Sequence, residues 1–251
     1  MKTLAIALSA VFCLLALRPA AFGQSAAADE SVAVATAKLQ EQYAASFGGH
    51  PQLYNGPEYV DYAKRYHART GHQFFLSPDM QTGRVDYNGQ SFQNIRLAYD
   101  VVLDQVVLSH PTSPLLLRLI NEKARGFTVN NHSFIRLVAD SASGAVIRTG
   151  YYEVLVDSSV QVLAKRAKRQ QEHLQQQQVD VEFTDTDRLF IRKAGQYYAI
   201  KRKSQALRLF ADQKPALQKF MQEQKLSFRK ADFEASVVQL ARYYCSLPTA
   251  K

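Results

Sequence analysis

The sequence predicts a mainly β protein with some helix: an antiparallel meander sheet, curved or folded into a sandwich or open barrel, with an N-terminal helix and a C-terminal helical pair. Three observations support this fold class. From about residue 73, apolar side chains recur at every second position. Turn residues separate these runs at spacings of roughly 8 to 12 residues, which is typical of sequential antiparallel strands. From Ser204 the apolar period becomes helical.

The clearest hairpin is the segment RVDYNGQSFQNIRL at residues 84–97. Asn88 and Gly89 suit the two positive-φ positions of a type I′ turn, because these residue types tolerate that backbone region. We therefore expect one strand to end near Tyr87 and the next to begin near Phe92. Further runs predict strands at 105–108, 115–120, 126–129, 132–138, 151–156, 160–166, 179–183, 188–193 and 196–202.

Residues 1–23 are expected to be a cleavable signal peptide. Lys2 gives a positive start, an apolar run follows, and small residues precede Gln24. The apolar run stops at Arg18, short of the about 20 residues that a membrane-spanning helix needs. We therefore expect an exported protein, periplasmic or extracellular, with no transmembrane span in the mature chain.

The rest of the chain divides into three expected parts. Residues 24–72 form an N-terminal linker and helical segment, residues 73–203 form the antiparallel β domain, and residues 204–251 form helices that pack on the sheet. Asp212 and Asp232 are placed to cap these helices. Cleavage would remove Cys13 and leave Cys245 as a small apolar side chain in a helical stripe, with no disulfide within the chain.

The chain is basic, with a formal net charge of +9, and removal of residues 1–23 would leave +7. Outside the cytoplasm, nucleic acid is not an expected partner, whereas anionic envelope lipid, lipopolysaccharide or acidic glycan is. Residues 164–178 are basic and then glutamine-rich, and are expected to form a long hairpin loop or strand extension, or a contact for anionic ligands. The candidate anion-binding residues are Lys165, Arg166, Lys168, Arg169, Arg192, Lys193, Lys201, Arg202 and Lys203.

The sequence contains no catalytic or metal-binding motif that we recognise. There is no GxSxG, HExxH, CxxC or glycine-rich phosphate loop. Paired carboxylates occur at Asp100 with Asp104 and at Asp185 with Asp187, and these lie in predicted turns, where Asp is favoured for backbone bonding. We therefore expect no catalytic residue, no metal and no cofactor.

Several motifs resemble a family of exported proteins of Gram-negative bacteria that has no assigned activity. The segments are LYNGPEY at 53–59, GHQFF at 71–75, VDYNG at 85–89 and LAYDVVLDQVV at 97–107. The GYYEVL run and the terminal LSFRKADFEASVVQLARYY fit the same pattern. The resemblance implies export and a β-rich body.

These observations favour a non-enzymatic exported protein of the cell envelope that binds an anionic or lipid-like component. A glycan hydrolase using the carboxylate pairs is an alternative, as is a structural module that assembles through exposed strand edges. A lipid-like ligand would need an apolar pocket inside the curved sheet. Its candidate lining residues are Phe92, Ile95, Leu97, Leu115, Leu117, Phe134, Ile135, Val154 and Val156.

Overall fold

A computed structural model describes residues 32, 35–36, 38–39, 50–139, 146–175 and 178–248 of the 251-residue chain. The chain forms two compact units, Met1–Pro51 and Gln52–Lys251. The described residues between Val32 and Leu39 are helical, whereas the predicted signal peptide lies outside the described residues.

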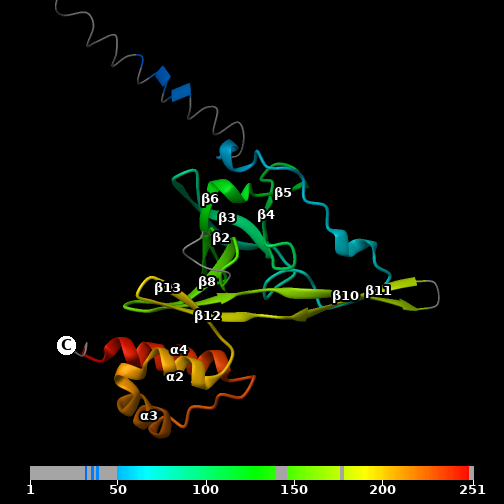
Figure 1. Cartoon of the computed structure of the whole chain (residues 1–251). Helices are drawn as coiled ribbons and strands as arrows, with labels where there is room; N and C mark the ends of the chain where they lie inside the picture. Colours follow the sequence, from blue (N-terminus) through cyan, green and yellow to red (C-terminus); the bar gives the residue numbers. More distant parts are fainter. Residues whose placement is uncertain are drawn as a thin grey trace, which may run out of the picture. The chain divides into compact units, whose positions relative to one another are not determined.

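Ten strands form one open sheet, which confirms the mainly β fold with antiparallel neighbours (Figure 1). Its spatial order is β13-β12-β9-β8-β7-β6-β2-β3-β4-β5, so the terminal strands β13 and β5 do not close a barrel. The strands are β2 (Gln81–Tyr87), β3 (Gln90–Asp100), β4 (Gln105–Ser109), β5 (Leu116–Arg118), β6 (Ala124–Val129), β7 (His132–Leu137), β8 (Gly150–Asp157), β9 (Gln161–Lys165), β12 (Arg188–Lys193) and β13 (Gln196–Ile200).

The predicted β2–β3 hairpin is confirmed. Asn88 and Gly89 have φ values of 51° and 78°, as a type I′ turn requires. Val85 pairs with Phe92 in the ladder. The hydrophobic pattern and the turn chemistry therefore set the same register.

The described residues of 161–193 form one long hairpin that passes through two sheets. Its base, β9 and β12, belongs to the ten-stranded sheet. Its outer part, β10 (Lys168–Gln175) and β11 (Gln178–Asp185), forms a three-stranded sheet with β1 (Arg69–Thr70), which pairs parallel to β11. Figure 1 shows this outer part, the arm, running out beyond the larger sheet. Of the two structures expected for the basic and glutamine-rich stretch, the strand extension is the observed one.

Two apolar clusters lie on the same face of the ten-stranded sheet. Phe134 pairs with Glu153, and Glu153 pairs with Ala164, so these three side chains share a face. Phe134 belongs to the cluster over β2–β8, and Ala164 belongs to the cluster beneath the C-terminal helices. The buried carboxylate of Glu153 therefore lies at the seam between the two clusters.

The helices α2 (Lys203–Leu209), α3 (Lys214–Glu223) and α4 (Phe233–Ser246) cover β9, β12 and β13. The rings of Phe220 and Tyr243 stack with centroids 4.0 Å apart and join α3 to α4, which confirms the C-terminal pair. The cap expected at Asp212 is wrong, because α3 begins after Gln213 and the Asp212 carboxylate bonds Lys193 and Tyr244 instead. Cys245 is half-buried against this cluster.

The segment before β2 is part of the second unit and covers the β5 edge. The Arg118 N–H donates to the carbonyl of Pro57, and the Tyr59 N–H donates to the carbonyl of Leu116. The 3₁₀ turn Tyr62–Arg65 lies in this segment, and another, Pro51–Leu53, spans the boundary between the two units. None of the helices that the structure describes is long and apolar enough to cross a membrane.

Candidate functional site

The nine basic residues singled out in the sequence divide into two groups. Four are half-buried and bond carboxylates or backbone carbonyls, and five are exposed. Arg166 is the most strongly engaged. It follows β9 on the face shared by the two apolar clusters, and its side chain is 13% exposed. Its guanidinium contacts Glu153 at 2.5 Å, Asp187 at 2.7 Å and Glu234 at 2.7 Å.

These contacts make Arg166 the centre of a charge network at the seam. Glu234 lies in the first turn of α4 and accepts two guanidinium bonds, so the network ties that helix to the sheet. Glu153 also accepts a bond from His132 on β7. Burial lowers the pKa of Arg166, but Glu234, Glu153 and Asp187 outweigh burial and raise it overall, so the guanidinium stays charged.

The Lys165 side chain lies on the opposite face of the sheet and bonds other residues there. Its Nζ lies 2.7 Å from Asp104 Oδ1 and donates to the carbonyl of Tyr151. Burial lowers the pKa of Lys165, and the Asp104 carboxylate partly opposes that shift. The pair sits against Gly150, whose φ is 151° and where an added Cβ would lie 2.0 Å from Asp104 Oδ2.

Lys168 and Lys193 are engaged with backbone carbonyls. Lys168 Nζ donates to the carbonyls of His72 and Phe74 at 2.8 and 2.7 Å, and burial lowers its pKa. Lys193 Nζ donates to the carbonyl of Leu209 and pairs with Asp212 at 2.8 Å. Both lysines therefore hold segments of the fold together.

The other five candidates are exposed, namely Arg169, Arg192, Lys201, Arg202 and Lys203. The register of β12 and β13 pairs Leu189 with Ile200, so the next step places Arg188 beside Lys201. Lys203 Nζ lies 5.2 Å from the Phe228 ring, which places the start of α2 beside the residues that follow Phe228. We define the basic cluster as the exposed residues Arg188, Lys201, Arg202, Lys203, Arg229 and Lys230.

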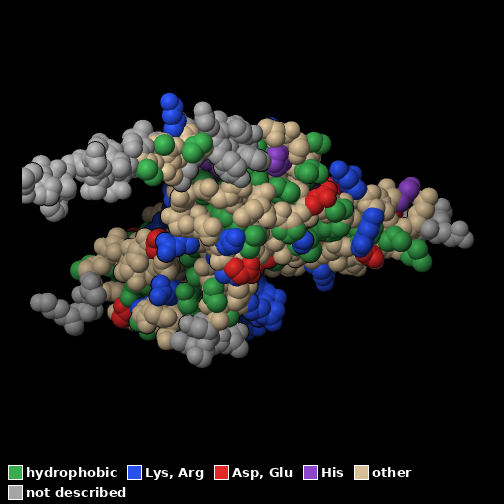
Figure 2. All heavy atoms as spheres, turned by 90° about the horizontal axis from the view of Figure 1, so that it is seen from above, with side chains coloured by type: hydrophobic (Ala, Val, Ile, Leu, Met, Phe, Trp, Pro, Cys, Tyr) green, Lys and Arg blue, Asp and Glu red, His purple; other side chains and the backbone are tan. Residues whose placement is uncertain are grey.

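The basic cluster makes no ion pair with any carboxylate in the part of the chain that the structure describes. Our sequence reasoning missed Arg188, Arg229 and Lys230, although the charge distribution signals them. Residues 188–248 carry 13 basic and 4 acidic side chains, whereas residues 50–187 carry 14 and 15. On the face shown in Figure 2, Lys and Arg side chains are spread over the surface, with Asp and Glu between some of them.

Three of the four carboxylates in the predicted pairs have structural contacts. Asp100 is fully buried and accepts bonds from the hydroxyls of Tyr59 and Tyr62 and from two backbone amides. Burial raises the pKa of Asp100, and these hydrogen bonds oppose the shift. Asp104 pairs with Lys165, and Asp187 pairs with Arg166.

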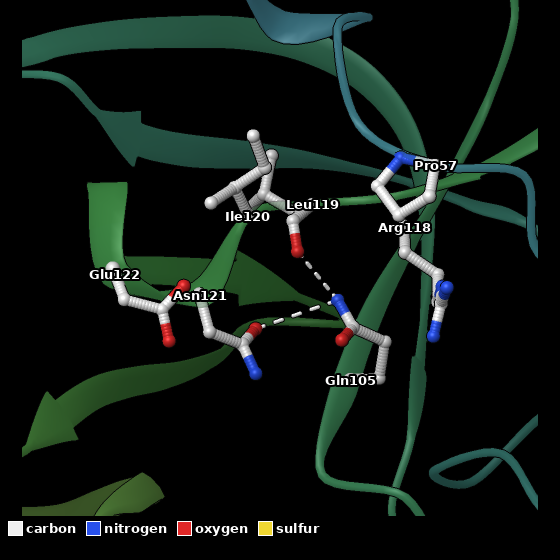
Figure 3. Close-up of a pocket in the computed structure, with 7 residues that line it drawn as sticks. All are labelled: Pro57, Gln105, Arg118, Leu119, Ile120, Asn121 and Glu122. Atoms are coloured by element: carbon white, nitrogen blue, oxygen red, sulfur yellow. Dashed lines mark hydrogen bonds between the residues drawn. The ribbon is translucent and has the colours of Figure 1, made fainter.

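A small pocket lies beside the turn Asn121–Lys123 and has a volume of about 260 Å³ (Figure 3). Gln105 Nε2 donates to the carbonyl of Leu119 at 2.6 Å, and Asn121 Oδ1 accepts from Tyr151. The polar groups at its floor thus bond to one another. No predicted anion-binding residue and no paired carboxylate lines it; its lining residues are Pro57, Gln105, Arg118, Leu119, Ile120, Asn121 and Glu122.

The residues expected to line an apolar pocket lie on both faces of the sheet. Phe134 is buried in the larger cluster, where its ring stacks on Phe127 with centroids 4.7 Å apart. The Tyr99 ring packs edge-on against Phe134. Ile135 and Val154 pack on the opposite face, and Leu115 is 44% exposed. Phe92, Ile95, Leu97, Leu117 and Val156 are buried.

No family model matches this chain, and neither a curated protein nor a solved structure shows significant similarity to it. The resemblance to exported proteins of Gram-negative bacteria therefore stays a prediction from the motifs. What the structure adds is a role for several motif residues. Tyr59 and Asp100 bond each other, and a Cβ at Gly56 would lie 1.8 Å from the carbonyl oxygen of Arg118.

Proposed function

We propose that this chain is a non-enzymatic exported protein of the cell envelope that binds an anionic envelope component through the basic cluster. The observation that carries the proposal is the accumulation of exposed cations without carboxylate partners at Arg188, Lys201–Lys203 and Arg229–Lys230, within a region of net charge +9. Export rests on the predicted signal peptide at residues 1–23.

The chemistry of the cluster suits a surface with several negative charges. Its side chains are long, exposed and spread over a strand end, a helix start and a loop, and none of them lines the pocket beside Asn121–Lys123. Each Lys or Arg near an anionic lipid surface contributes about 1 kcal/mol of attraction. Several such contacts add up to useful affinity without a shaped pocket.

The ligand class is a phosphate- or carboxylate-bearing envelope component, such as an anionic lipid headgroup, lipopolysaccharide or an acidic glycan. These sources share the charge that the cluster would recognise. Co-sedimentation with phosphatidylglycerol vesicles, lipopolysaccharide aggregates and alginate gel beads distinguishes them. We expect binding at low salt that weakens at high salt, because exposed charges are screened within about 8 Å at physiological ionic strength.

A variant with Lys201→Gln, Arg202→Gln and Lys203→Gln tests the location of the site. We expect it to lose most of the low-salt binding. The matched control is Lys64→Gln, Arg96→Gln and Arg125→Gln, which removes the same number of exposed cations outside the cluster. Equal loss in both variants would show that only net charge matters, and binding that is insensitive to salt would exclude the cluster as its cause.

The hydrolase alternative has less support from the structure. Both members of the Asp100 and Asp104 pair bond to neighbouring side chains, and Asp187 is held by Arg166. A general acid and base need to face a substrate cleft, and the described pocket contains only Glu122 among acidic side chains.

A further inference from the structure

The arm has one open edge. Among the residues that the structure describes, β10 is a terminal strand of the three-stranded sheet and pairs with β11 alone, and the other side of β11 is covered in part by β1. The β10–β11 ladder runs from Lys168 to Gln175 without a bulge, and β10 contains no proline. Natural proteins usually protect such an edge, because its backbone groups can pair with another strand.

The register shows which backbone groups of β10 face outward. The Thr186 N–H donates to the carbonyl of Ala167 at 2.8 Å, so Ala167 bonds toward the β11 side. Antiparallel ladders alternate between hydrogen-bonded and non-bonded pairs. The odd-numbered residues of β10 therefore bond to β11, and the even-numbered ones present their N–H and C=O to the open edge; these are Lys168, Gln170, Glu172 and Leu174.

We propose that this edge pairs with the same edge of a second copy of the chain, antiparallel and with the two-fold axis at Gln171. Residues that face each other across an antiparallel pair lie on the same face of the sheet. The side chains on one face of β10 are all odd-numbered or all even-numbered. The two-fold axis must therefore pass through a residue and not between two neighbouring residues. Centring on Gln171 aligns residues 168–174 of both copies. The result is a continuous sheet of the two arms.

The side chains of β10 suit this register. Gln170 lies opposite Glu172 of the second copy, so no like charges meet at this position, and the two Gln171 side chains face each other. Within each copy Gln170 Nε2 donates to Tyr66 and Glu172, and the Glu172 carboxylate also pairs with Arg65. Centring on Glu172 instead would set two carboxylates opposite each other, which is unfavourable. Centring on Gln170 would shorten the paired segment to residues 168–172.

The charged side chains also permit this pairing. Arg169 lies beside His173 of the second copy, and in each copy His173 Nε2 is 3.7 Å from a Glu182 carboxylate oxygen. Arg169 is exposed and has no ion pair within the described residues. A single pair of strands is a small interface, so the dimer is weak and depends on concentration.

Disulfide trapping tests the register. In a background in which Cys13 and Cys245 are replaced by Ser, Gln171→Cys places two thiols opposite each other in a non-bonded pair, where Cβ atoms are about 4.5–5.5 Å apart. We expect disulfide-linked dimer under mild oxidation, at least about tenfold more than for Gln178→Cys. Gln178 is exposed on the same arm but lies on β11.

Sedimentation equilibrium of the otherwise unmodified protein gives an independent readout. We expect the dimer fraction to rise with concentration, and Gln171→Arg to weaken dimerisation about tenfold because like charges then meet at the axis. Gln178→Arg is the control and should leave it unchanged. A monomer at every concentration, or equal disulfide yields from Gln171→Cys and Gln178→Cys, would overturn the proposal.

Discussion

Arg166 and Arg169 stand three residues apart in the same basic run and have opposite environments. Arg166 is 13% exposed and contacts three carboxylates at the seam of the sheet, whereas Arg169 is exposed on the arm. The sequence around them is similar, so residue type does not decide the difference. The face of the hairpin decides how exposed each arginine is. The Arg166 side chain lies on the same face as Ala164, over the core, and the Arg169 side chain lies on the other face.

Replacing Arg166 is the strongest test of this comparison. Arg166→Ala would leave the buried Glu153 carboxylate with only His132 as a partner and would free Glu234 at the start of α4. Breaking a buried ion pair by removing one partner costs about 3–5 kcal/mol. We expect a loss of that size in the free energy of unfolding measured with urea.

The control for that measurement is Arg169→Ala, for which we expect a change within about 0.5 kcal/mol, as at most surface positions. If both variants unfold at the same urea concentration, the network contributes nothing and the comparison fails. If Arg166→Ala is as stable as the original protein, the seam is held by apolar packing alone.

A second test concerns Lys165 and the glycine beneath its ion pair. Gly150→Ala would place a Cβ 2.0 Å from Asp104 Oδ2 and 2.6 Å from Lys165 Nζ, at a φ of 151°. We expect a loss of at least about 2 kcal/mol in unfolding free energy, since strained backbone alone costs about 1–3 kcal/mol. Differential scanning calorimetry would report it as a lower Tm.

Gly195→Ala is the matched control. Gly195 also has a positive φ, 80°, but no atom lies within 4 Å of the added Cβ. Its expected cost is therefore only the left-handed backbone penalty, about 1–2 kcal/mol. Equal losses of unfolding free energy in Gly150→Ala and Gly195→Ala would show that the Lys165–Asp104 pair does not add to the cost at Gly150.

A third test uses pH. Burial raises the pKa of Asp100 in the folded protein above its unfolded value, so the folded state binds more protons between the two values. The contribution of Asp100 to stability is therefore greatest at pH values below its unfolded pKa and falls as pH rises through the folded pKa. We expect the unfolding free energy of the original protein, relative to that of Asp100→Asn, to fall as pH rises over this acidic range. A constant difference in unfolding free energy from pH 3 to pH 7 would contradict the raised pKa.

Much of the fold could be predicted from the sequence, because strand period and turn chemistry are local. Asn88-Gly89 and Ala194-Gly195 ended strands where expected, and both turns have positive φ values. On the arm, the strand predicted at 179–183 matches β11, because Val179, Val181 and Phe183 alternate with polar residues. The polar residues of β10 show no apolar alternation, so the sequence does not decide between loop and strand there. The cap at Asp212 was predicted wrongly, since a carboxylate can bond a distant lysine, here Lys193, as readily as a nearby amide.

The candidate site was less predictable, because it depends on contacts between distant segments. The nine basic residues are consecutive or nearly so in three runs, but pairing places Lys165 and Arg188 opposite each other and Arg192 opposite Gln161. Lys165 then faces Asp104, which is 61 positions away in the chain. For the missed residues Arg188, Arg229 and Lys230, the one signal in the sequence is the net charge of residues 188–248.

The smallest expected effect concerns the stability of the basic cluster itself. Replacing Lys201, Arg202 and Lys203 by Gln should change the unfolding free energy by no more than about 0.5 kcal/mol per residue, because these side chains are exposed and form no ion pair in the described part of the chain. The sign should be slightly stabilising at low salt, since neighbouring cations repel one another. That gain should vanish at high salt, where the charges are screened. Urea unfolding of the triple variant at both salt concentrations would measure it, and a large loss of stability would mean that these cations hold the fold together, as Arg166 does.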